Sequence, residues 1–301
     1  MFNKAIKKNV NQIELSGYIK SLISLMKPRV ISLVIFTCAV GFVTSNPNLK
    51  TFDAIIAITL VALGSGAAGC LNMWYEADLD ALMTRTCLRP IPTGKINRQQ
   101  ALIFGILLTA FSVVSLNYFT NFLSAFLLFF TIAFYLFVYT IWLKRKTPQN
   151  IVIGGIAGSL PPVIGWTIST NSISLVPISL FLIIFFWTPS HFWALSLYKT
   201  EDYNNAKIPM LPVVSGIKTT KINIFVYAII LFLTSITPYF FGYSGITYFV
   251  SSILLGSYYV YLCYKLLIEK DESEKIAKKI FIYSILYLFL IFTIILIDNI
   301  L

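Results

Sequence analysis

The chain has 301 residues, of which 57% are hydrophobic and only 12% are charged, and its mean hydropathy is +0.81. A soluble domain carries about 25% charged residues, so this chain has too few to cover a water-facing surface. The formal net charge is +11. Apolar bulk with scattered bases argues against a nucleic-acid binder, whose positive charge would gather on one soluble face. Composition therefore predicts an integral membrane protein.

Segments long enough to cross a bilayer follow one another along the chain, since a helix needs about 20 apolar residues to span the hydrocarbon core. They cover residues 29–46, 52–72, 100–117, 121–143, 150–169, 173–197, 222–242, 245–266 and 279–298. Turn-forming residues separate the closest of them, as in Gly242-Tyr243-Ser244-Gly245. A helix satisfies its own backbone hydrogen bonds in lipid. We therefore expect an all-α bundle of nine transmembrane helices.

The segment before the first apolar run, residues 1–28, is polar, basic and weakly amphipathic. It lacks the short apolar core and the small-residue cleavage site of a signal peptide. We expect a cytoplasmic interfacial segment over residues 1–28 that leads into a membrane domain of residues 29–301.

The basic residues are distributed unevenly between the two sides of the expected bundle. Of the 23 Lys and Arg residues, 22 lie in the N-terminal segment and in alternate loops, and only Lys50 lies on the other side. Basic residues near membrane helices remain in the cytoplasm. The N-terminus is thus expected in the cytoplasm and the C-terminus in the periplasm of a bacterial inner membrane, since no transit peptide precedes the first run.

The carboxylates gather at two places on the expected cytoplasmic side. Asn72, Glu76 and Asp80 follow the second run at intervals of four, so they share one helix face if that helix continues. Asp78 then lies on the opposite flank, or it points toward the site if the helix has ended. Stacked like charges cost a helix ~0.2–0.5 kcal/mol per pair. A divalent cation would remove this cost, and Mg²⁺ takes one or two carboxylates together with phosphate oxygens. The stripe therefore predicts a magnesium site.

The second acidic cluster, Glu201 and Asp202, follows the sixth run as the first cluster follows the second run. Two four-helix units arranged as a parallel repeat would bring both clusters to one apolar cavity that opens to the cytoplasmic side. Bases in the same loops would bind phosphate oxygens, and we assign this role to Arg85, Arg89, Lys95 and Lys199. A ligand with a diphosphate head and a hydrocarbon tail fits such a cavity. The alternative is that the acids simply pair with Arg85 and Arg89.

His191, the only histidine, lies between two tryptophans near the cytoplasmic end of the sixth run. It is either a hydrogen-bonded structural residue or a functional one, which would contact the metal of a porphyrin or carry a proton. The fourth run has Tyr135, Tyr139 and Trp142 at helical spacing. Their rings either face a carbocation or belong to the membrane core and interfacial belt.

At these residues the chain resembles the UbiA-type intramembrane prenyltransferases, on Asn72-x3-Glu76-x3-Asp80 and the partner loop after the sixth run. More narrowly, it resembles the haem-farnesylating branch of that family. The residues that carry this resemblance are Lys27-Pro28-Arg29, 72–80, Met83-Thr84-Arg85-Thr86, Arg89-Pro90, 161–166, Trp187-x3-His191-Phe192 and 202–212. The chain departs from the commoner first motif of the superfamily, which has Asp where Met73 and Glu76 stand.

The resemblance implies a Mg²⁺-dependent transfer of farnesyl from farnesyl diphosphate to a vinyl group of haem b, with water addition, giving haem O. Haem b is then a substrate and not a resident cofactor. The metal ligands implied are Glu76, Asp80 and Asp202, with Asn72, Asp78 and Glu201 in support, and His191 is the candidate haem contact. Hand-over of the product to haem A synthase or a terminal oxidase is a further expectation.

Three other functions fit the sequence less well. Another UbiA-type aromatic prenyltransferase, acting on a quinone or chlorophyll precursor, would have the same architecture. A transporter would place charges at mid-depth and often has inverted repeats, whereas this chain has no mid-span charge and both clusters on one side. A non-catalytic assembly factor would not need two acidic clusters with basic rims.

Overall fold

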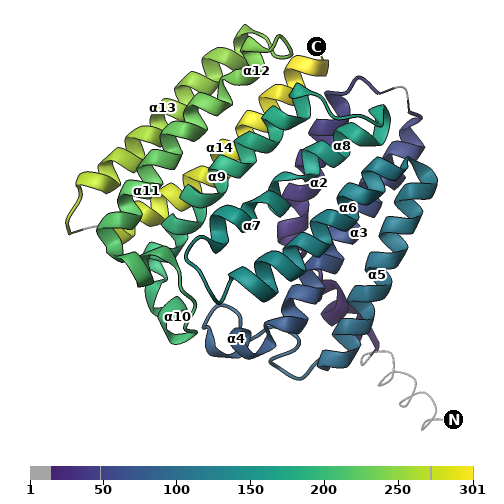
Figure 1. Cartoon of the computed structure of the whole chain (residues 1–301), viewed down its shortest axis with the longest axis horizontal. Helices are drawn as coiled ribbons and strands as arrows, with labels where there is room; N and C mark the ends of the chain where they lie inside the picture. The colour runs from purple at the N-terminus through teal and green to yellow at the C-terminus, as the bar shows by residue number, and fades with distance from the viewer. Residues whose placement is uncertain (1–14, 48, 272, 301) are drawn as a thin grey trace, which may run out of the picture.

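The computed structural model describes residues 15–47, 49–271 and 273–300, which form helices joined by short connections and contain no β-strand. The helices lie side by side in one bundle (Figure 1). A helix over Leu15–Leu25 comes first. It is followed by α2 (Pro28–Val43), α3 (Thr51–Tyr75), α4 (Ala77–Leu82), α5 (Arg98–Phe119), α6 (Phe122–Ala133), the π-helix η1 (Phe134–Leu143), α7 (Asn150–Ser159), α8 (Pro161–Thr170), α9 (Leu175–Tyr198), α10 (Thr200–Asn205), α11 (Leu211–Ser235), α12 (Thr237–Phe240), α13 (Ile246–Ile268) and α14 (Ser273–Ile300).

The predicted all-α architecture is confirmed. Within the described ranges, eight helical segments are long and apolar enough to cross a membrane, and the bent pair of Leu15–Leu25 and α2 brings the number to nine. Two helices begin well before their apolar runs: α11 begins at Leu211 and α14 at Ser273. Their first turns carry lysines such as Lys218 and Lys278, so hydropathy detects only the apolar part of each helix.

Two of the spans are interrupted. The fourth changes from α-helix to π-helix at Phe134, so that its last ten residues form η1. The fifth is divided between α7 and α8, because Pro161 and Pro162 have no backbone N–H to continue the hydrogen bonding of α7. Proline is well suited to the first helical positions, where that donor is unused, and α8 therefore begins at Pro161.

Glycine allows α2 and α8 to approach closely. A Cβ atom on Gly41 of α2 would collide with the carbonyl oxygen of Pro162, and one on Gly165 of α8 would collide with the carbonyl oxygen of Cys38. Small residues of this kind let the backbones of membrane helices pack directly against each other. This contact joins the first half of the bundle to the second.

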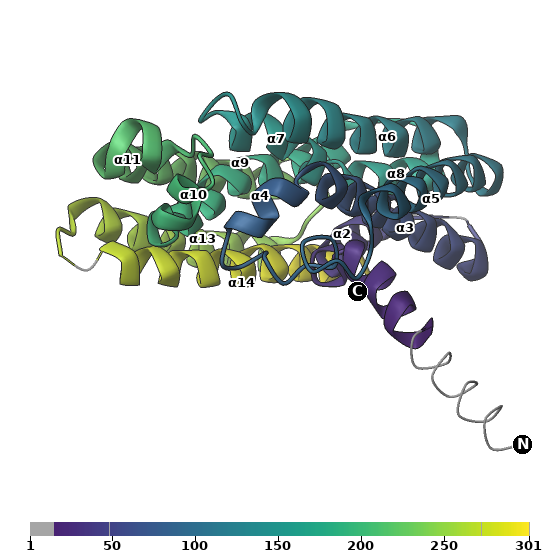
Figure 2. The same cartoon turned by 90° about the horizontal axis from the view of Figure 1, so that it is seen from below.

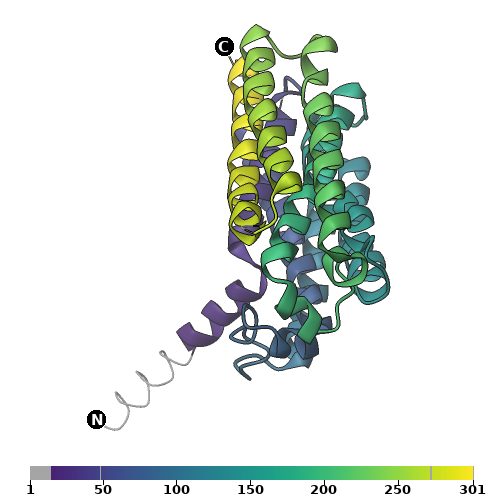
Figure 3. The ribbon, with the colours of Figure 1, turned by 90° about the vertical axis from the view of Figure 1, so that its left-hand side faces the viewer.

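The short helices α4 and α10 lie at the same end of the bundle (Figures 1 and 2). The helix Leu15–Leu25 projects from that end at 52° to α2, whereas α14 finishes at the opposite end (Figure 3). The bend lies at Lys27, whose φ of 58° is in the left-handed region, followed by Pro28. The predicted interfacial segment is thus helical where it is described, and its residues 1–14 lie outside the described part.

Candidate active site

The acidic segment after α3 keeps its polar side chains on one face although the helix is interrupted at Glu76. The N–H of Glu76 donates to the carbonyl of Asn72 at 2.9 Å, and that of Asp80 donates to the carbonyl of Glu76 at 2.8 Å. Helical hydrogen bonding therefore continues from α3 into α4 and aligns the three side chains. Each is buried, with an exposed fraction of 2% to 3%. The predicted stripe is present, and Asp78 lies on its more exposed flank.

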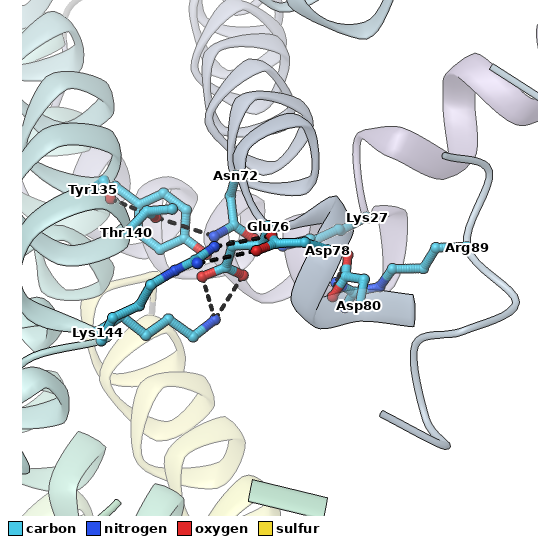
Figure 4. A network of polar contacts seen from close by, with 10 residues as sticks. Lys27, Asn72, Glu76, Asp78, Asp80, Arg89, Tyr135, Thr140 and Lys144 are labelled. Carbon is cyan, nitrogen blue, oxygen red and sulfur yellow. Dashed lines mark hydrogen bonds and ion pairs between the residues drawn. The ribbon is translucent and has the colours of Figure 1, made fainter. Parts of the chain in front are cut away.

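Basic side chains contact all three carboxylates, one from the following loop and two from the end of the fourth span (Figure 4). Lys144 Nζ lies 2.5 Å from Oε1 of Glu76 and donates a hydrogen bond of 2.6 Å to Oε2. Arg89 Nη1 donates to both carboxylate oxygens of Asp80 at 2.8 Å. These two pairs are largely buried, so their charges interact strongly. Like-charge repulsion within the stripe is thereby offset by bases.

The third carboxylate, Asp78, forms a more exposed pair with Arg145. The two guanidinium nitrogens of Arg145 donate to its carboxylate at 2.9 and 3.0 Å, and 53% of the Asp78 side chain is exposed. Partial burial favours the neutral acid, but the hydrogen bonds and charge of Arg145 outweigh it and lower the pKa of Asp78. This carboxylate is held outside the buried stripe.

A chain of three hydrogen bonds fixes the amide of Asn72 (Figure 4). Lys27 Nζ donates to its Oδ1 at 2.6 Å, and its Nδ2 donates to Thr140 Oγ1 at 3.0 Å. The Thr140 hydroxyl in turn donates to the carbonyl of Tyr135 at 2.8 Å, five residues earlier in η1. The Thr140 proton is used toward Tyr135, so Thr140 can only accept from Asn72, and the Lys27 ammonium can only donate. The amide nitrogen of Asn72 therefore faces Thr140 and its Oδ1 faces Lys27. Burial, and then the positive charge of Arg89, lower the pKa of Lys27 to about 7.

The two acidic segments meet, as the repeat predicted. Thr84, in the loop after α4, donates to both carboxylate oxygens of Asp202 at 2.8 and 3.0 Å. In the same loop, the guanidinium of Arg85 lies 5.1 Å from the ring centre of Tyr203. Asp202 is 8% exposed at the start of α10. The loop after α3 and α4 and the segment after α9 therefore form one site.

The interpretation that the acids pair with Arg85 and Arg89 holds only for Asp80 and Arg89. Glu76 and Asp78 instead pair with Lys144 and Arg145, which the sequence indicated only as markers of the cytoplasmic side. The signal that could have found them is their position directly after the fourth span, on the same side as the acids.

The other two predicted phosphate ligands are Lys199 and Lys95. Lys199 connects α9 to α10 beside Glu201, which is exposed. Lys95, in contrast, lines a cavity of about 580 Å³ next to the N-terminal helix, together with Tyr18 and Lys20. Leu88 and Pro90 line the same cavity, so Lys95 lies beside the loop whose Arg89 pairs with Asp80.

The aromatic residues of the fourth span separate into two groups. The rings of Tyr135 and Tyr139 stack at 5.3 Å, and Lys144 Nζ lies 5.7 Å from the ring centre of Tyr139. Both tyrosines therefore lie near the acidic stripe. Trp142 is 56% exposed on the outer surface, as a residue of the interfacial belt would be.

His191 is buried in the second half of the bundle. Its ring lies between the rings of Trp187 and Phe281, with centroid distances of 4.2 and 4.5 Å. Its Nδ1 is 2.6 Å from Oγ of Ser284 in α14. Tyr198, at the end of α9, is seven positions further along the chain, about 10 Å along the helix axis.

The oxygen ligands of the acidic stripe suit Mg²⁺. Oε1 of Glu76 is buried against Lys144 Nζ, and a carboxylate oxygen has a second lone pair with which it could coordinate a cation. Across the described ranges, no three His, Cys, Asp or Glu side chains gather closely enough to hold an ion by themselves. Mg²⁺ typically uses one or two carboxylates and completes its shell with phosphate and water. The residues therefore fit an ion that binds together with a phosphate ligand.

The sequence over residues 33–285 matches the UbiA prenyltransferase family, and the chain belongs to this family of integral membrane proteins. It is 63% identical to protoheme IX farnesyltransferase of Pelagibacter ubique, with 100% of both chains covered. It is 54% identical to protoheme IX farnesyltransferase of Bartonella bacilliformis, covering 92% of this chain and 89% of the relative.

Solved structures share the fold at low sequence identity. A structure of a digeranylgeranylglyceryl phosphate synthase superposes with a TM-score of 0.78 at 18% identity, covering 94% of this chain and 99% of the other. A UbiA homologue from Archaeoglobus fulgidus, bound to DMAPP and Mg²⁺, gives a TM-score of 0.64 at 17% identity, covering 91% and 99%. The predicted bundle is therefore the UbiA fold.

Proposed function

We propose that this protein is a Mg²⁺-dependent prenyltransferase that transfers farnesyl from farnesyl diphosphate to a vinyl group of haem b, giving haem O. The observation that carries the proposal is the identity of 63% over the full chain to a protoheme IX farnesyltransferase. The same relationship favours haem over a quinone or chlorophyll precursor as the acceptor. The buried acidic stripe and Asp202 provide the carboxylates that a Mg²⁺-dependent transfer from a diphosphate needs.

We assign the diphosphate and its ion to the place where the two acidic segments meet. Glu76, Asp80 and Asp202 are the proposed Mg²⁺ ligands, and Asn72, Asp78 and Glu201 support them. Arg85, Arg89 and Lys199 are proposed to bind phosphate oxygens. To these we add Lys27 and Lys144, whose ammonium groups already lie against the stripe. Lys95 is proposed as a further phosphate ligand at the edge of this site, because the cavity that it lines is also lined by Leu88 and Pro90, on either side of Arg89.

When bound, Mg²⁺ would neutralise the diphosphate and stabilise it as a leaving group. The bases of this chain do the same work at fixed positions, since Arg89 and Lys144 are held by the carboxylates before the substrate arrives. As the allylic C–O bond ionises, the stacked rings of Tyr135 and Tyr139 are near enough to the stripe to stabilise the cation.

The second half of the proposed reaction takes place on haem b, the acceptor. The haem vinyl group attacks the farnesyl cation and forms the new C–C bond. Water captures the cation left on the porphyrin side and loses a proton, which gives the hydroxyethylfarnesyl arm. Water must be excluded before the C–C bond forms, because it would otherwise trap the cation as farnesol. We propose His191, deeper in the bundle than the acidic site, as the contact for haem.

The distribution of basic residues and the expected number of spans also predict where the protein lies in the cell. We propose a bacterial inner membrane, with the N-terminus in the cytoplasm and the C-terminus in the periplasm, and hand-over of haem O to haem A synthase or a terminal oxidase. The placing of 22 of 23 basic residues on one side supports the orientation.

The direct test is to incubate membranes that contain the protein with haem b, farnesyl diphosphate and Mg²⁺, and to detect haem O by its mass. Product should depend on all three, and chelation of Mg²⁺ should abolish it. A quinone precursor and a chlorophyll precursor, offered in place of haem b, test the rival acceptors. Prenylation of either one in preference to haem b would refute the proposal.

The matched variants are Asp80→Asn in the stripe and Asp53→Asn at the other end of α3. Asp80→Asn should lower turnover by on the order of 10²-fold or more, because it removes a charge from the reacting site. Asp53→Asn should leave turnover unchanged. Equal activity of the two variants, at equal amounts of folded protein, would remove Asp80 from the metal site.

A further inference from the structure

The contact between His191 and Ser284 links α9 to α14 inside the bundle. Both residues are buried, and His191 Nδ1 is 2.6 Å from Ser284 Oγ. A neutral imidazole has one donor nitrogen and one acceptor nitrogen, and the hydrogen bonds it makes determine which is which. The direction of this one hydrogen bond therefore decides what chemistry the other nitrogen, Nε2, can do.

The hydroxyl of Ser284 has its own proton engaged elsewhere. Its Oγ lies 2.7 Å from the carbonyl oxygen of Phe281, one turn earlier in α14. A carbonyl can only accept, and a serine hydroxyl has a single proton, so Ser284 donates to Phe281. Toward His191 the Ser284 oxygen can then only accept. Nδ1 of His191 must carry the imidazole proton.

We propose that Ser284 is a positioning residue that holds His191 in the Nδ1–H tautomer, so that Nε2 presents a lone pair to the iron of haem. The inference rests on the proposed function for the identity of the ligand. Within the part of the chain that the structure describes, the His191 ring is hydrogen bonded at Nδ1 and not at Nε2. Metal-binding histidines characteristically donate their second N–H to a protein oxygen, which fixes both tautomer and ring orientation. In this protein the Ser284 Oγ is the oxygen that accepts this second N–H, from Nδ1 of His191.

The surroundings also fix the plane of the ring. Trp187 and Phe281 stack on its two sides, with interplanar angles of 18° and 24°. Trp187 Nε1 donates to the backbone carbonyl of Ser284 at 2.7 Å. The stacking residues and the hydrogen-bonding residue are thus tied to one another, and His191 cannot rotate without breaking this arrangement. Such preorganisation is expected of a ligand that binds a flat porphyrin at a set angle.

The tautomer can be measured directly, because this chain has only one histidine. In protein labelled with ¹⁵N-histidine, a single pair of imidazole nitrogens appears in the NMR spectrum, and their shifts report which nitrogen is protonated. We expect a protonated Nδ1 and an unprotonated Nε2 in the wild type. A protonated Nε2 with a bare Nδ1 in the wild type would overturn the inference whether or not any variant folds.

Variants then test the part played by Ser284. Ser284→Ala should lose the preference for Nδ1–H, and Ser284→Thr, which keeps a hydroxyl, should retain it. Ser252→Ala is the matched control, because Ser252 is also fully buried and donates to the carbonyl three residues earlier, without contacting the histidine. An Nδ1–H tautomer that persists in Ser284→Ala would show that Ser284 does not set it.

Titration with ferric haem tests the ligand separately from the tautomer. Ser284→Ala should weaken haem binding by about 10–100-fold, the usual effect of removing a residue that supports a metal ligand. His191→Ala should remove the spectroscopic signature of imidazole ligation. If His191→Ala leaves that signature and the affinity unchanged, the haem contact is refuted. Haem O formation, measured in parallel, shows whether the proposed function itself holds.

Discussion

At the scale of single residues, the acidic site contains two kinds of ion pair with different consequences. The side chains of Glu76 and Lys144 are 3% and 15% exposed, so removing either one would leave the other as an unpaired charge in the protein interior. Breaking a buried pair in this way costs about 3–5 kcal/mol. Asp78 and Arg145 are 53% and 36% exposed, and a surface pair contributes about 0–1 kcal/mol.

Two neighbouring residues therefore give a matched test. Lys144→Met should lower the free energy of unfolding by about 3–5 kcal/mol, because Glu76 loses its buried partner. Arg145→Met, one position along the chain, should lower it by about 1 kcal/mol or less. Thermal or denaturant unfolding of both variants in the same detergent measures the difference. If both variants lose stability equally, the buried pair has no special role.

At the scale of helices, the site depends on interrupted spans. The π-helix η1 brings Thr140 within hydrogen-bonding distance of the Tyr135 carbonyl, and the same hydroxyl accepts from Asn72. π-Helical turns are frequent at functional sites for this reason, since they change which groups face a ligand. Gly69 of α3 lets the bend before α2 approach closely, since a Cβ atom there would lie 3.2 Å from the carbonyl oxygen of Met26 and 3.5 Å from Cδ of Lys27, which keeps Lys27 beside Asn72.

The glycines of the fifth span should respond differently to the same substitution. Gly165→Ala would push a methyl group into the backbone of α2, which cannot move aside easily, and should lower stability by about 1–3 kcal/mol or more. Gly158→Ala meets no atom within 4 Å and should be neutral or stabilising, because alanine is preferred over glycine in helices by up to about 1 kcal/mol. Melting temperatures of the two variants compare them, and equal values would mean that α2 and α8 are not tightly packed.

At the scale of the whole molecule, the number of spans determines where the two ends of the bundle lie. The helix Leu15–Leu25 and the end of α14 are at opposite ends in the structure, as nine crossings require (Figure 3). The segments that carry the acidic residues, α4 and α10, share the end from which Leu15–Leu25 projects (Figure 1). A charged diphosphate would therefore reach the site from the side of the N-terminus.

A reporter enzyme measures the orientation. Alkaline phosphatase, which is active only outside the cytoplasm, should be active when fused after Leu301. The same reporter inserted in the loop after Lys146 should be inactive, because that loop is basic and expected in the cytoplasm. Activity in the loop fusion and none in the terminal fusion would reverse the orientation. Equal signals from the two fusions would place both points on one side of the membrane, and would contradict an odd number of crossings between them.

Local pattern in the sequence predicted the spans, their side of the membrane and the stripe of Asn72, Glu76 and Asp80. Hydropathy and helical spacing act over a few turns, so they can be evaluated without the fold. The parallel positions of the two clusters even indicated that Asp202 would meet the loop after α4, although not that Thr84 would hold it.

Only the tertiary structure decided the partners: Lys144 for Glu76, Lys27 for Asn72 and Ser284 for His191. The two residues of each pair are separated by 45 to 93 positions in the chain. A lysine at the end of a helix has the same local pattern whether it faces water or a buried carboxylate. The packing of the helices decides between these two environments. Helix packing is determined by contacts between segments rather than by the composition of any one segment.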